Sequence, residues 1–264
     1  MANSVIDDAP YSAFHRKLLF LSAGGPFLDG YVLSIIGVVL VGISKDLGLT
    51  SLEEGLVGAS ALVGLFVGGL FFGRLTDRVG RQLMYMIDLT VLVVGSALCV
   101  FVTEGWQLVV LRFVLGVAVG ADYPIATALL IEWLPSRQRG RVMGLLMVAW
   151  FTGAAAATAV GYVLVRAMGD GAWPWALASA TVPSLVILIA RMGAPESPRW
   201  LVSHGRRAEA RKFVTKMLGR PVTDDELDQL DEGEKVQVVG FRGLFQGRYL
   251  VRTAFVGVFW TFQI

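Results

Sequence analysis

Apolar residues fall into six long runs separated by short polar stretches, and a seventh run begins at the end of the sequence. The six runs cover Leu18–Ile43, Leu56–Leu75, Leu83–Val102, Trp106–Leu134, Val142–Val165 and Trp173–Met192. A helix needs roughly 20 apolar residues to cross a bilayer, so the pattern predicts an all-α, polytopic membrane protein with a six-helix bundle over residues 18–192. The seventh run, residues 249–264, is shorter than that length, and we interpret it as a span that the sequence leaves incomplete.

Composition supports this class and narrows the function. The chain of 264 residues is 55% hydrophobic and only 17% charged, whereas globular domains are about 25% charged. Its single cysteine, Cys99, can form no disulfide within the chain. His15 and His204 stand alone, and neither a phosphate-binding G-x-x-x-x-G-K-[ST] loop nor an H-E-x-x-H motif is present. We therefore expect no enzyme, no cofactor, no metal site and no nucleic-acid partner.

Basic residues predict the orientation in the bilayer. Of the 23 lysines and arginines, 20 lie before the first run, between runs two and three, between runs four and five, or after run six. Lys45 and Arg166 lie in the opposite loops, and Arg112 lies inside a run. Because cytoplasmic loops are enriched in lysine and arginine, the N-terminus (residues 1–17) and the long polar segment (residues 193–248) are predicted to be cytoplasmic. The expected location is a bacterial inner, or plasma, membrane.

The polar segment contains two predicted amphipathic helices. Ser203–Leu218 is basic, and Asp224–Lys235 is acidic with Thr223 as its N-cap. Two interpretations stay open: a solvated linker whose short helices lie against the membrane face, or a partner-binding surface.

Ionisable residues within the apolar runs are the candidate functional site. Asp29, Arg112 and Asp122 each lie well inside a run, where a charge costs about 2.5–3.5 kcal/mol on insertion scales. Asp29 is the expected partner of Arg112, either as a pair that substrate or a proton can break or as a permanent packing salt bridge. A further acid, Asp88, is expected to pair with a loop arginine. Aromatic residues accompany the acids, and we add them as candidate substrate contacts: Tyr31, Tyr123 and Trp150.

Two glycines and an internal repeat add to this site. Gly116 and Gly120 are one helical turn apart, which allows a neighbouring backbone to approach closely. Asp29 and Asp122 each lie in the first helix of a three-helix group, and the two groups have opposite topology because three is odd. Acidic sites at matching places in inverted repeats are typical of the central site of a transporter.

A short turn between the second and third runs carries one acid among three arginines. The stretch runs from Gly73 to Gln82, with Asp77 next to Arg74, Arg78 and Arg81. One interpretation is a group of ion pairs that forms and breaks as the conformation changes. The other is positive charge that only sets the topology.

Four ordered stretches resemble the major facilitator superfamily, in its sugar-porter-like branch. They are the loop G-x-x-x-D-R-x-G-R at residues 73–81, Arg112-x-x-x-Gly116-x-x-x-Gly120, E-x-x-P-x-x-x-R-G-R at residues 132–141, and Pro-Glu-Ser-Pro-Arg at residues 195–199. The resemblance implies two six-helix halves, each of 3+3 inverted repeats, joined by a cytoplasmic helical linker, with alternating access between them. It assigns gating roles to Gly73, Asp77, Arg78, Gly80, Arg81, Glu132, Arg139, Arg141, Glu196 and Arg199.

Departures from the family pattern bear on the substrate. Gln82 stands where the loop signature ends in a basic residue, and Val32 stands where many relatives carry a proton-coupling aspartate. The fifth run has no glutamine of the kind that hexose carriers use, whereas Asp122-Tyr123-Pro124 resembles carriers of phosphate or organic anions. We expect a secondary transporter of a small polar metabolite (sugar, organic acid or phosphate), coupled to protons. The alternative is a truncated, non-transporting half of such a carrier, because the C-terminal six-helix half is missing from the sequence.

Overall fold

The computed structural model describes residues 6, 9–232, 243 and 245–261, and all regular elements in this part of the chain are helices. Five stretches are long and apolar enough to cross a membrane, and the last of them, Ser136–Arg191, contains more than one helix. The helices of the bundle are α1 (Ala13–Leu47), α2 (Ser51–Val79), α3 (Arg81–Leu98), α4 (Gly105–Trp133), α5 (Arg139–Met168), α6 (Trp173–Ala178) and α7 (Thr181–Arg191). Short 3₁₀ turns at Cys99–Phe101, Ser136–Gln138 and Gly169–Ala172 connect them.

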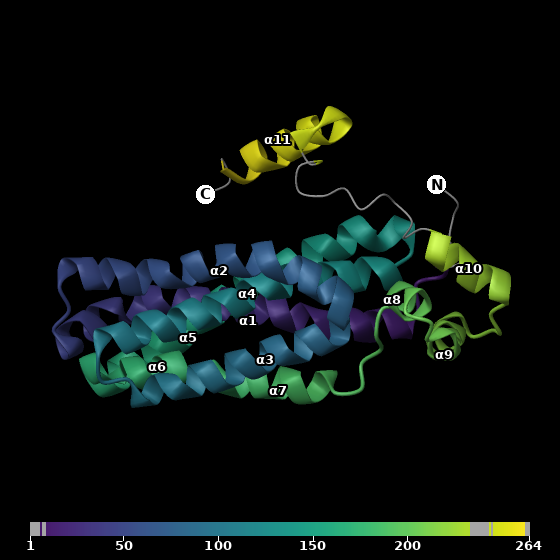
Figure 1. Ribbon diagram of the computed structural model, residues 1–264. Helices are drawn as coiled ribbons and strands as arrows, with labels where there is room; N and C mark the ends of the chain where they lie inside the picture. Colours follow the sequence, from purple (N-terminus) through teal and green to yellow (C-terminus); the bar gives the residue numbers. More distant parts are fainter. Residues whose placement is uncertain (1–5, 7–8, 233–242, 244, 262–264) are drawn as a thin grey trace.

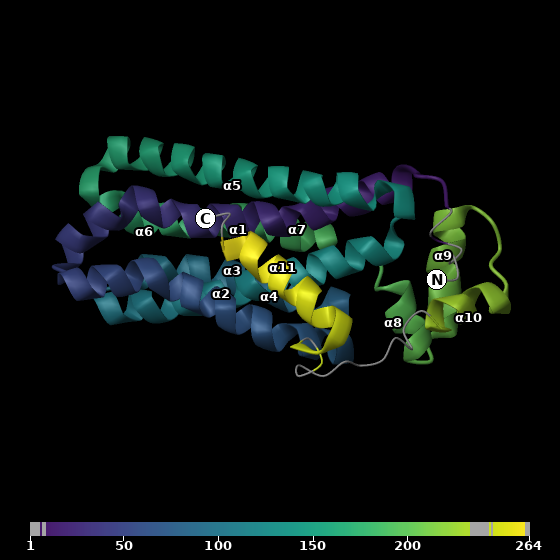
Figure 2. The ribbon, with the colours of Figure 1, turned by 90° about the horizontal axis from the view of Figure 1, so that it is seen from above.

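The bundle consists of α1 to α5 together with α6 and α7, which lie end to end as a sixth rod (Figure 1). Helix α2 packs along α4, α1 packs along α5, and α3 lies against both α4 and α7. Seen from above, the same helices run nearly parallel along one axis (Figure 2). The all-helical six-rod bundle expected from the apolar runs is therefore confirmed.

The sixth rod is broken, which the apolar pattern did not predict. Helix α6 ends at Ala178 and α7 begins at Thr181. Pro183 explains the break, because proline has no N–H to donate to the carbonyl four residues earlier and its ring clashes with that carbonyl. The chain turns instead at Ser179, whose N–H bonds to Trp175 and Ala176.

Glycines allow two pairs of helices to touch backbone to backbone. A Cβ on Gly116 or Gly120 of α4 would collide with the carbonyl oxygens of Ala61 or Leu65 on α2. On the opposing helix, Gly64 and Gly68 of α2 face α4 in the same way. The close approach predicted for the α4 glycines is thus confirmed. Gly30 of α1 and Gly153 of α5 play the same part between those helices.

A hydrophobic core joins three short helices to one end of the bundle. We call this end the basic end. Helices α8 (Pro198–Ser203), α9 (Arg207–Leu218) and α10 (Asp224–Glu232) gather there. Their apolar side chains pack with the last turn of α4 and the first turns of α1 and α5, through Leu201, Val214, Leu227, Leu130 and Trp133 among others. The three helices are therefore joined to the bundle by a common core.

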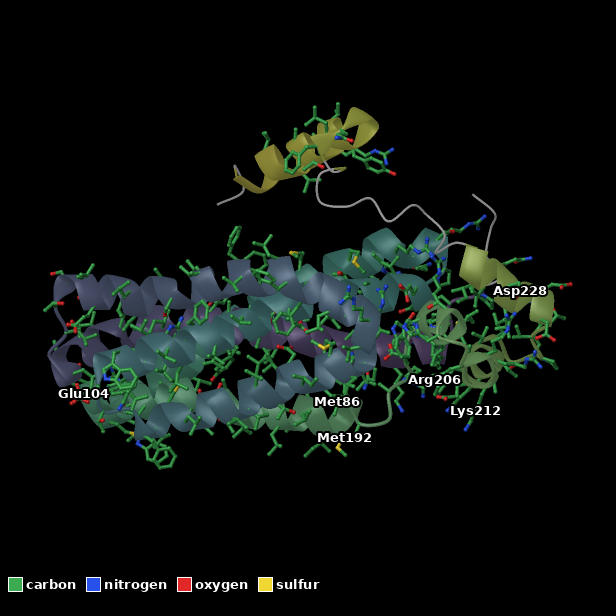
Figure 3. All side chains as sticks on the ribbon, viewed as in Figure 1. Met86, Glu104, Met192, Arg206, Lys212 and Asp228 are labelled. Carbon is green, nitrogen blue, oxygen red and sulfur yellow. The ribbon has the colours of Figure 1, made fainter. Side chains whose placement is uncertain are left out.

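Ion pairs join the predicted basic and acidic helices to each other. Arg207 pairs with Asp228, and Arg211 pairs with Asp224, so that α9 and α10 are joined along their length. The N-cap at Thr223 is confirmed, since its hydroxyl accepts the N–H of Glu226 at 3.3 Å. Charged side chains gather around these helices in Figure 3, where Arg206, Lys212 and Asp228 are labelled.

Helix α11 (Gly247–Thr261) covers most of the seventh apolar run. It lies apart from the bundle in Figure 1, and in the view from above it crosses in front of the bundle (Figure 2). The preceding residues 233–242 and 244 lie outside the described part of the chain, including the end of the predicted acidic helix at Lys235.

Candidate functional site

Three buried carboxyl groups face one another inside the bundle. They belong to Asp29 of α1, Asp88 of α3 and Asp122 of α4, which are 2%, 4% and 0% exposed. Asp122 interacts electrostatically with both other acids, and Asp29 with Asp88. The side-chain oxygens of Asp88 have no hydrogen-bond partner, whereas the Asp122 carboxyl group lies within hydrogen-bonding reach of Asp29 and Tyr85. We call these three residues the carboxyl cluster.

A buried arginine at the end of α7 completes the cluster. Arg191 is fully buried, and its guanidinium lies 3.7 Å from the centre of the Tyr85 ring. Its Nη1 donates to the Ser22 hydroxyl at 3.0 Å, and its charge acts on Asp122. The guanidinium is therefore the cation that offsets the negative charge of the carboxyl cluster.

Proline and glycine in α1 create the space and the acceptor that this arrangement needs. Pro26 has no N–H, so the carbonyl of Ser22, four residues earlier, loses its helical donor. The Tyr85 hydroxyl takes that place and donates to the Ser22 carbonyl oxygen at 3.4 Å. A Cβ at Gly25 would collide with the Asp122 carboxyl group and the Tyr85 hydroxyl. Only glycine therefore lets α4 bring Asp122 against α1.

The expected pair between Asp29 and Arg112 is wrong. Arg112 is buried, but its Nε donates to the Val57 carbonyl oxygen of α2 at 3.1 Å. Ten residues of helix separate Arg112 from Asp122, which is about 15 Å along the axis. Because Asp29 lies beside Asp122, it is out of reach of Arg112.

The expected pairing of Asp88 with a loop arginine is also wrong. Its electrostatic partner is Asp122, and neither of its carboxyl oxygens accepts a hydrogen bond. Asp88 lies seven residues into α3, about 10 Å from the helix start. Its neighbours at that depth are the other acids.

The predicted aromatic contacts lie at different places. The Tyr31 hydroxyl is 2.7 Å from the Ser179 hydroxyl, at the break between α6 and α7. Trp150 is half-buried on α5 and stacks edge-on against Phe151. Its backbone carbonyl packs against Gly30 of α1, one residue from Asp29. The side chain of Tyr123 lies outside the described part of the structure.

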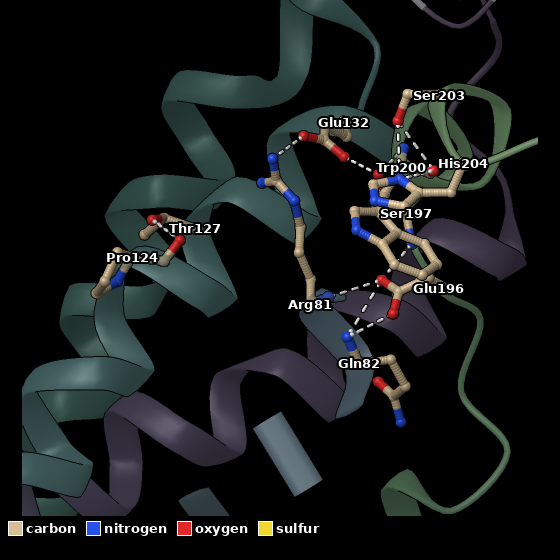
Figure 4. Close-up of polar contacts among 10 residues, drawn as sticks. All are labelled: Arg81, Gln82, Pro124, Thr127, Glu132, Glu196, Ser197, Trp200, Ser203 and His204. Carbon is tan, nitrogen blue, oxygen red and sulfur yellow. Dashed lines mark hydrogen bonds and ion pairs between the residues drawn. The ribbon is translucent and has the colours of Figure 1, made fainter. Parts of the chain in front are cut away.

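Motif residues from three segments meet at the basic end. The first amides of a helix have no partner within it, and at α3 the Glu196 carboxylate accepts them: Arg81 N–H at 3.1 Å and Gln82 N–H at 3.0 Å (Figure 4). The negative carboxylate is also favoured by the positive end of the helix dipole. Gly80, with φ of 110°, starts the helix, and a side chain there would approach Glu196 and Trp200.

Glu132 at the end of α4 ties these segments together. Its Oε1 lies 2.6 Å from Nη2 of Arg81, and its other oxygen accepts the Ser197 hydroxyl (Figure 4). Ser197 Oγ in turn accepts the Trp200 N–H at 3.1 Å and so caps α8. We call Arg81, Glu132, Glu196 and Ser197 the latch.

The other predicted gating residues lie around the latch. Arg139 Nε donates to the Ile131 carbonyl oxygen at 3.2 Å. The structure places the rest at the same end of the bundle: Gly73 and Arg199 half-buried, Arg78 and Arg141 exposed. The side chains of Asp77 and Arg74 lie outside the described part, so the predicted acid–arginine group of that turn stays a prediction.

Arg191, Tyr85 and Ser22 are site residues that the sequence analysis missed. Tyr85 and Asp88 are three residues apart, as are Gln82 and Tyr85, so all three share one face of α3. Polar residues at that spacing in an apolar helix were the available signal. Arg191 lies at the end of an apolar run, where it was counted with the loop arginines.

The bundle, with buried acids at its centre and a latch at one end, defines a polytopic helical membrane protein of the major facilitator fold. The chain belongs to the sugar (and other) transporter family, whose model matches residues 18–263. It is 42% identical over 258 residues to the protein YaaU of Escherichia coli (strain K12), covering 98% of this chain and 56% of that one. It is 37% identical over 254 residues to the inner membrane metabolite transport protein YgcS of the same strain, covering 96% and 56%.

A solved structure agrees on the fold. The proton:xylose symporter XylE bound to 6-bromo-6-deoxy-D-glucose matches with a TM-score of 0.77 and 21% identity, over 88% of this chain and 56% of that chain. The chain therefore spans about half the length of the relatives it matches.

Proposed function

We propose that this chain forms the N-terminal six-helix half of a proton-coupled secondary transporter for a small polar metabolite: a sugar, an organic acid or phosphate. Its partners are the lipid bilayer, the substrate, protons and a second six-helix half. The transporter works by alternating access, with the two halves rocking around a central site. The family membership and the metabolite transporters among the relatives support this class.

The carboxyl cluster is the observation that carries proton coupling. If Asp29, Asp88 and Asp122 were all ionised, Arg191 would leave a net charge of about −2 in the bundle interior. Two like charges about 5 Å apart repel by about 3 kcal/mol at an effective dielectric constant of ~20. Binding a proton relieves this repulsion, and the side-chain oxygens of Asp88, which have no hydrogen-bond partner, are free to take one.

The orientation follows from the charges at the two ends. The N-terminus, the turn before α3, the loop before α5 and helices α8 to α10 all lie at the basic end. We place this end in the cytoplasm by the positive-inside rule, in a bacterial inner membrane. The latch then acts as a cytoplasmic gate, and the carboxyl cluster lies between it and the substrate.

Uptake into proteoliposomes tests the proposal on the complete carrier that contains this sequence. Sugars, phosphate and aliphatic and aromatic acids are screened with an imposed pH gradient, acidic outside. Asp29→Asn is expected to abolish uphill uptake of the transported solute while leaving exchange. Asp170→Asn is the matched control, because that exposed acid pairs with the exposed Lys45, away from the carboxyl cluster. Undiminished gradient-driven uptake in Asp29→Asn would overturn the coupling role.

A second candidate function rests on the coverage of about half of each relative. In that alternative the chain is a non-transporting half that binds a partner or a solute. The reading frame beyond Ile264 separates the two: a frame that continues into a second six-helix half would exclude the alternative.

A further inference from the structure

A chain of polar interactions connects the carboxyl cluster to the latch. It begins with the electrostatic attraction between Asp122 and the guanidinium of Arg191. It continues through the hydrogen bond from Arg191 to the Gln82 side chain and ends with the hydrogen bond from the Gln82 backbone N–H to Glu196. The cluster lies within the bundle and the latch lies at its basic end. Arg191 is thus the one residue of this chain of contacts that interacts electrostatically with acids at both places, Asp122 and Glu196.

Gln82 holds Arg191 by two reciprocal hydrogen bonds. Its Nε2 donates to the Arg191 carbonyl oxygen at 3.0 Å, and its Oε1 accepts Nη2 of Arg191 at 3.1 Å. Its own backbone N–H donates to Glu196. The basic residue that the family signature has at this position would put a second cation against a buried guanidinium. Glutamine, with one donor and one acceptor, fits instead.

The guanidinium of Arg191 lies between two anions of different kinds. Asp122 belongs to a cluster of acids that repel one another, whereas Glu196 is engaged with the N-terminus of α3. Arginine stays charged under all relevant conditions. Protonation of Asp122 therefore removes one of its two counter-charges and leaves the other unchanged.

We propose that Arg191 is a positioning residue that transmits the protonation state of Asp122 to the latch. When Asp122 becomes neutral, the guanidinium moves toward Glu196 and competes for its carboxylate with the amides of Arg81 and Gln82. The first turn of α3 then loses its cap, and the latch opens. The proposal rests on the proposed function in one respect: the carboxyl cluster exchanges protons.

The groups around Arg191 leave Asp122 as the acid that can act on it in this way. The titratable and charged groups facing it are Tyr85 and Asp88 of α3, Asp29 of α1, Asp122 of α4, and Glu196 after α7. Of these, Tyr85, Asp122 and Glu196 act on Arg191 directly. Neutralising Asp29 removes a repulsion on Asp122 and should keep that residue ionised, so it should not open the latch.

Hydrogen exchange at the α3 N-terminus tests the proposal on the complete carrier in lipid nanodiscs. At one pH, Asp122→Asn is expected to raise the exchange rates of the Arg81 and Gln82 amides at least tenfold. Asp29→Asn, an equally buried neutralisation, should leave them unchanged. The first-turn amides of α2 at Glu53 and Glu54 serve as an internal reference, since their helix is capped by Thr50 at the opposite end.

The double variant Asp122→Asn with Arg191→Gln should return exchange at Arg81 and Gln82 to the wild-type rate. In the wild type, protection of these amides, corrected for intrinsic rates, should fall on acidification, and Arg191→Gln should abolish that pH dependence. The proposal is overturned if Asp122→Asn has no effect, if Asp29→Asn has the same effect, or if the rise persists without Arg191. A pH-linked latch without proton-driven uptake would instead refute the proposed function alone.

Discussion

Arg81 at the start of α3 forms an ion pair with Glu132 near the end of α4, with 2.6 Å between Nη2 and Oε1. The side chains are only 12% and 11% exposed, so the pair is largely shielded from water. It joins two sequence motifs that lie 51 positions apart. The same glutamate also accepts the Ser197 hydroxyl, which brings the segment after α7 into the same contact.

Breaking this pair should destabilise the bundle. Glu132→Gln removes the negative charge that faces the Arg81 guanidinium, and removing one partner of a buried pair costs about 3 kcal/mol. Thermal unfolding of the purified protein in detergent measures the change. The control is Lys45→Gln, which removes a pair whose side chains are 63% and 56% exposed and should cost less than about 1 kcal/mol. Equal losses in the two variants would contradict a structural role for the latch pair.

The backbone contact between α2 and α4 predicts a strict requirement for glycine. Gly120→Ala puts a methyl group onto the Leu65 carbonyl oxygen and should destabilise the protein by about 1–3 kcal/mol, as overpacking does. Gly144→Ala on α5 meets no atom within 4 Å and should be neutral or stabilising by up to about 1 kcal/mol. Unfolding midpoints of the two variants decide the point; a Gly120→Ala protein as stable as the wild type would disprove the close packing.

Acidification should weaken the N-terminal cap of α10 through Glu226. A hydrogen bond from Arg220, and then one from the Thr223 amide, lower the pKa of Glu226 from 4.5 to about 2. Because the pKa falls on folding, the stabilising contribution is complete above about pH 4.5 and is lost as the pH drops toward 2. The contribution is small, since Arg220 is half-exposed.

Carboxyl-carbon NMR can follow this titration site by site. Arg220→Gln should raise the pKa of Glu226 toward its ordinary value. Arg207→Gln, which removes the partner of Asp228 instead, should leave Glu226 unchanged. An unshifted Glu226 in the Arg220 variant would contradict the assigned cause.

A double-mutant cycle should identify the cation of the carboxyl cluster. Asp122→Asn and Arg191→Gln remove interacting groups, so their effects on unfolding free energy should deviate from additivity by about 0.5–3 kcal/mol. Asp29→Asn and Arg112→Gln act on groups several turns apart and should add within about 0.5 kcal/mol. Strong coupling between Asp29 and Arg112, with none between Asp122 and Arg191, would instead support the ion pair that the sequence suggested.

Much of the fold could be predicted from the sequence because its signals are local. Run length predicted the spans, and the spacing of Gly116 and Gly120 predicted a close helix contact, which α2 provides. Thr223 in front of the acidic run predicted the N-cap of a helix, which its hydrogen bond confirms. Pro183 indicated the break in the sixth rod. The run was identified by counting apolar residues, and that count is not changed by a missing backbone N–H.

The centre of the site was harder to predict because it depends on the relative height and rotation of four helices. Asp29 and Arg112 are complementary in charge, yet about 15 Å along the α4 axis separates Arg112 from the acids. Arg191 was grouped with loop arginines because it ends an apolar run, and only packing shows that it is fully buried against Tyr85. The latch was easier, because the motifs that supply Arg81, Glu132 and Glu196 were each visible at a helix boundary.

Proton movement that accompanies solute uptake tests the central claim most directly. The complete carrier in weakly buffered proteoliposomes, given its solute, should make the external medium more alkaline as protons enter with it. Asp122→Asn should abolish the pH change, while Arg112→Gln, if it folds, should retain it. A wild-type pH change that persists in Asp122→Asn, or solute uptake with no proton movement in the wild type, would contradict the account.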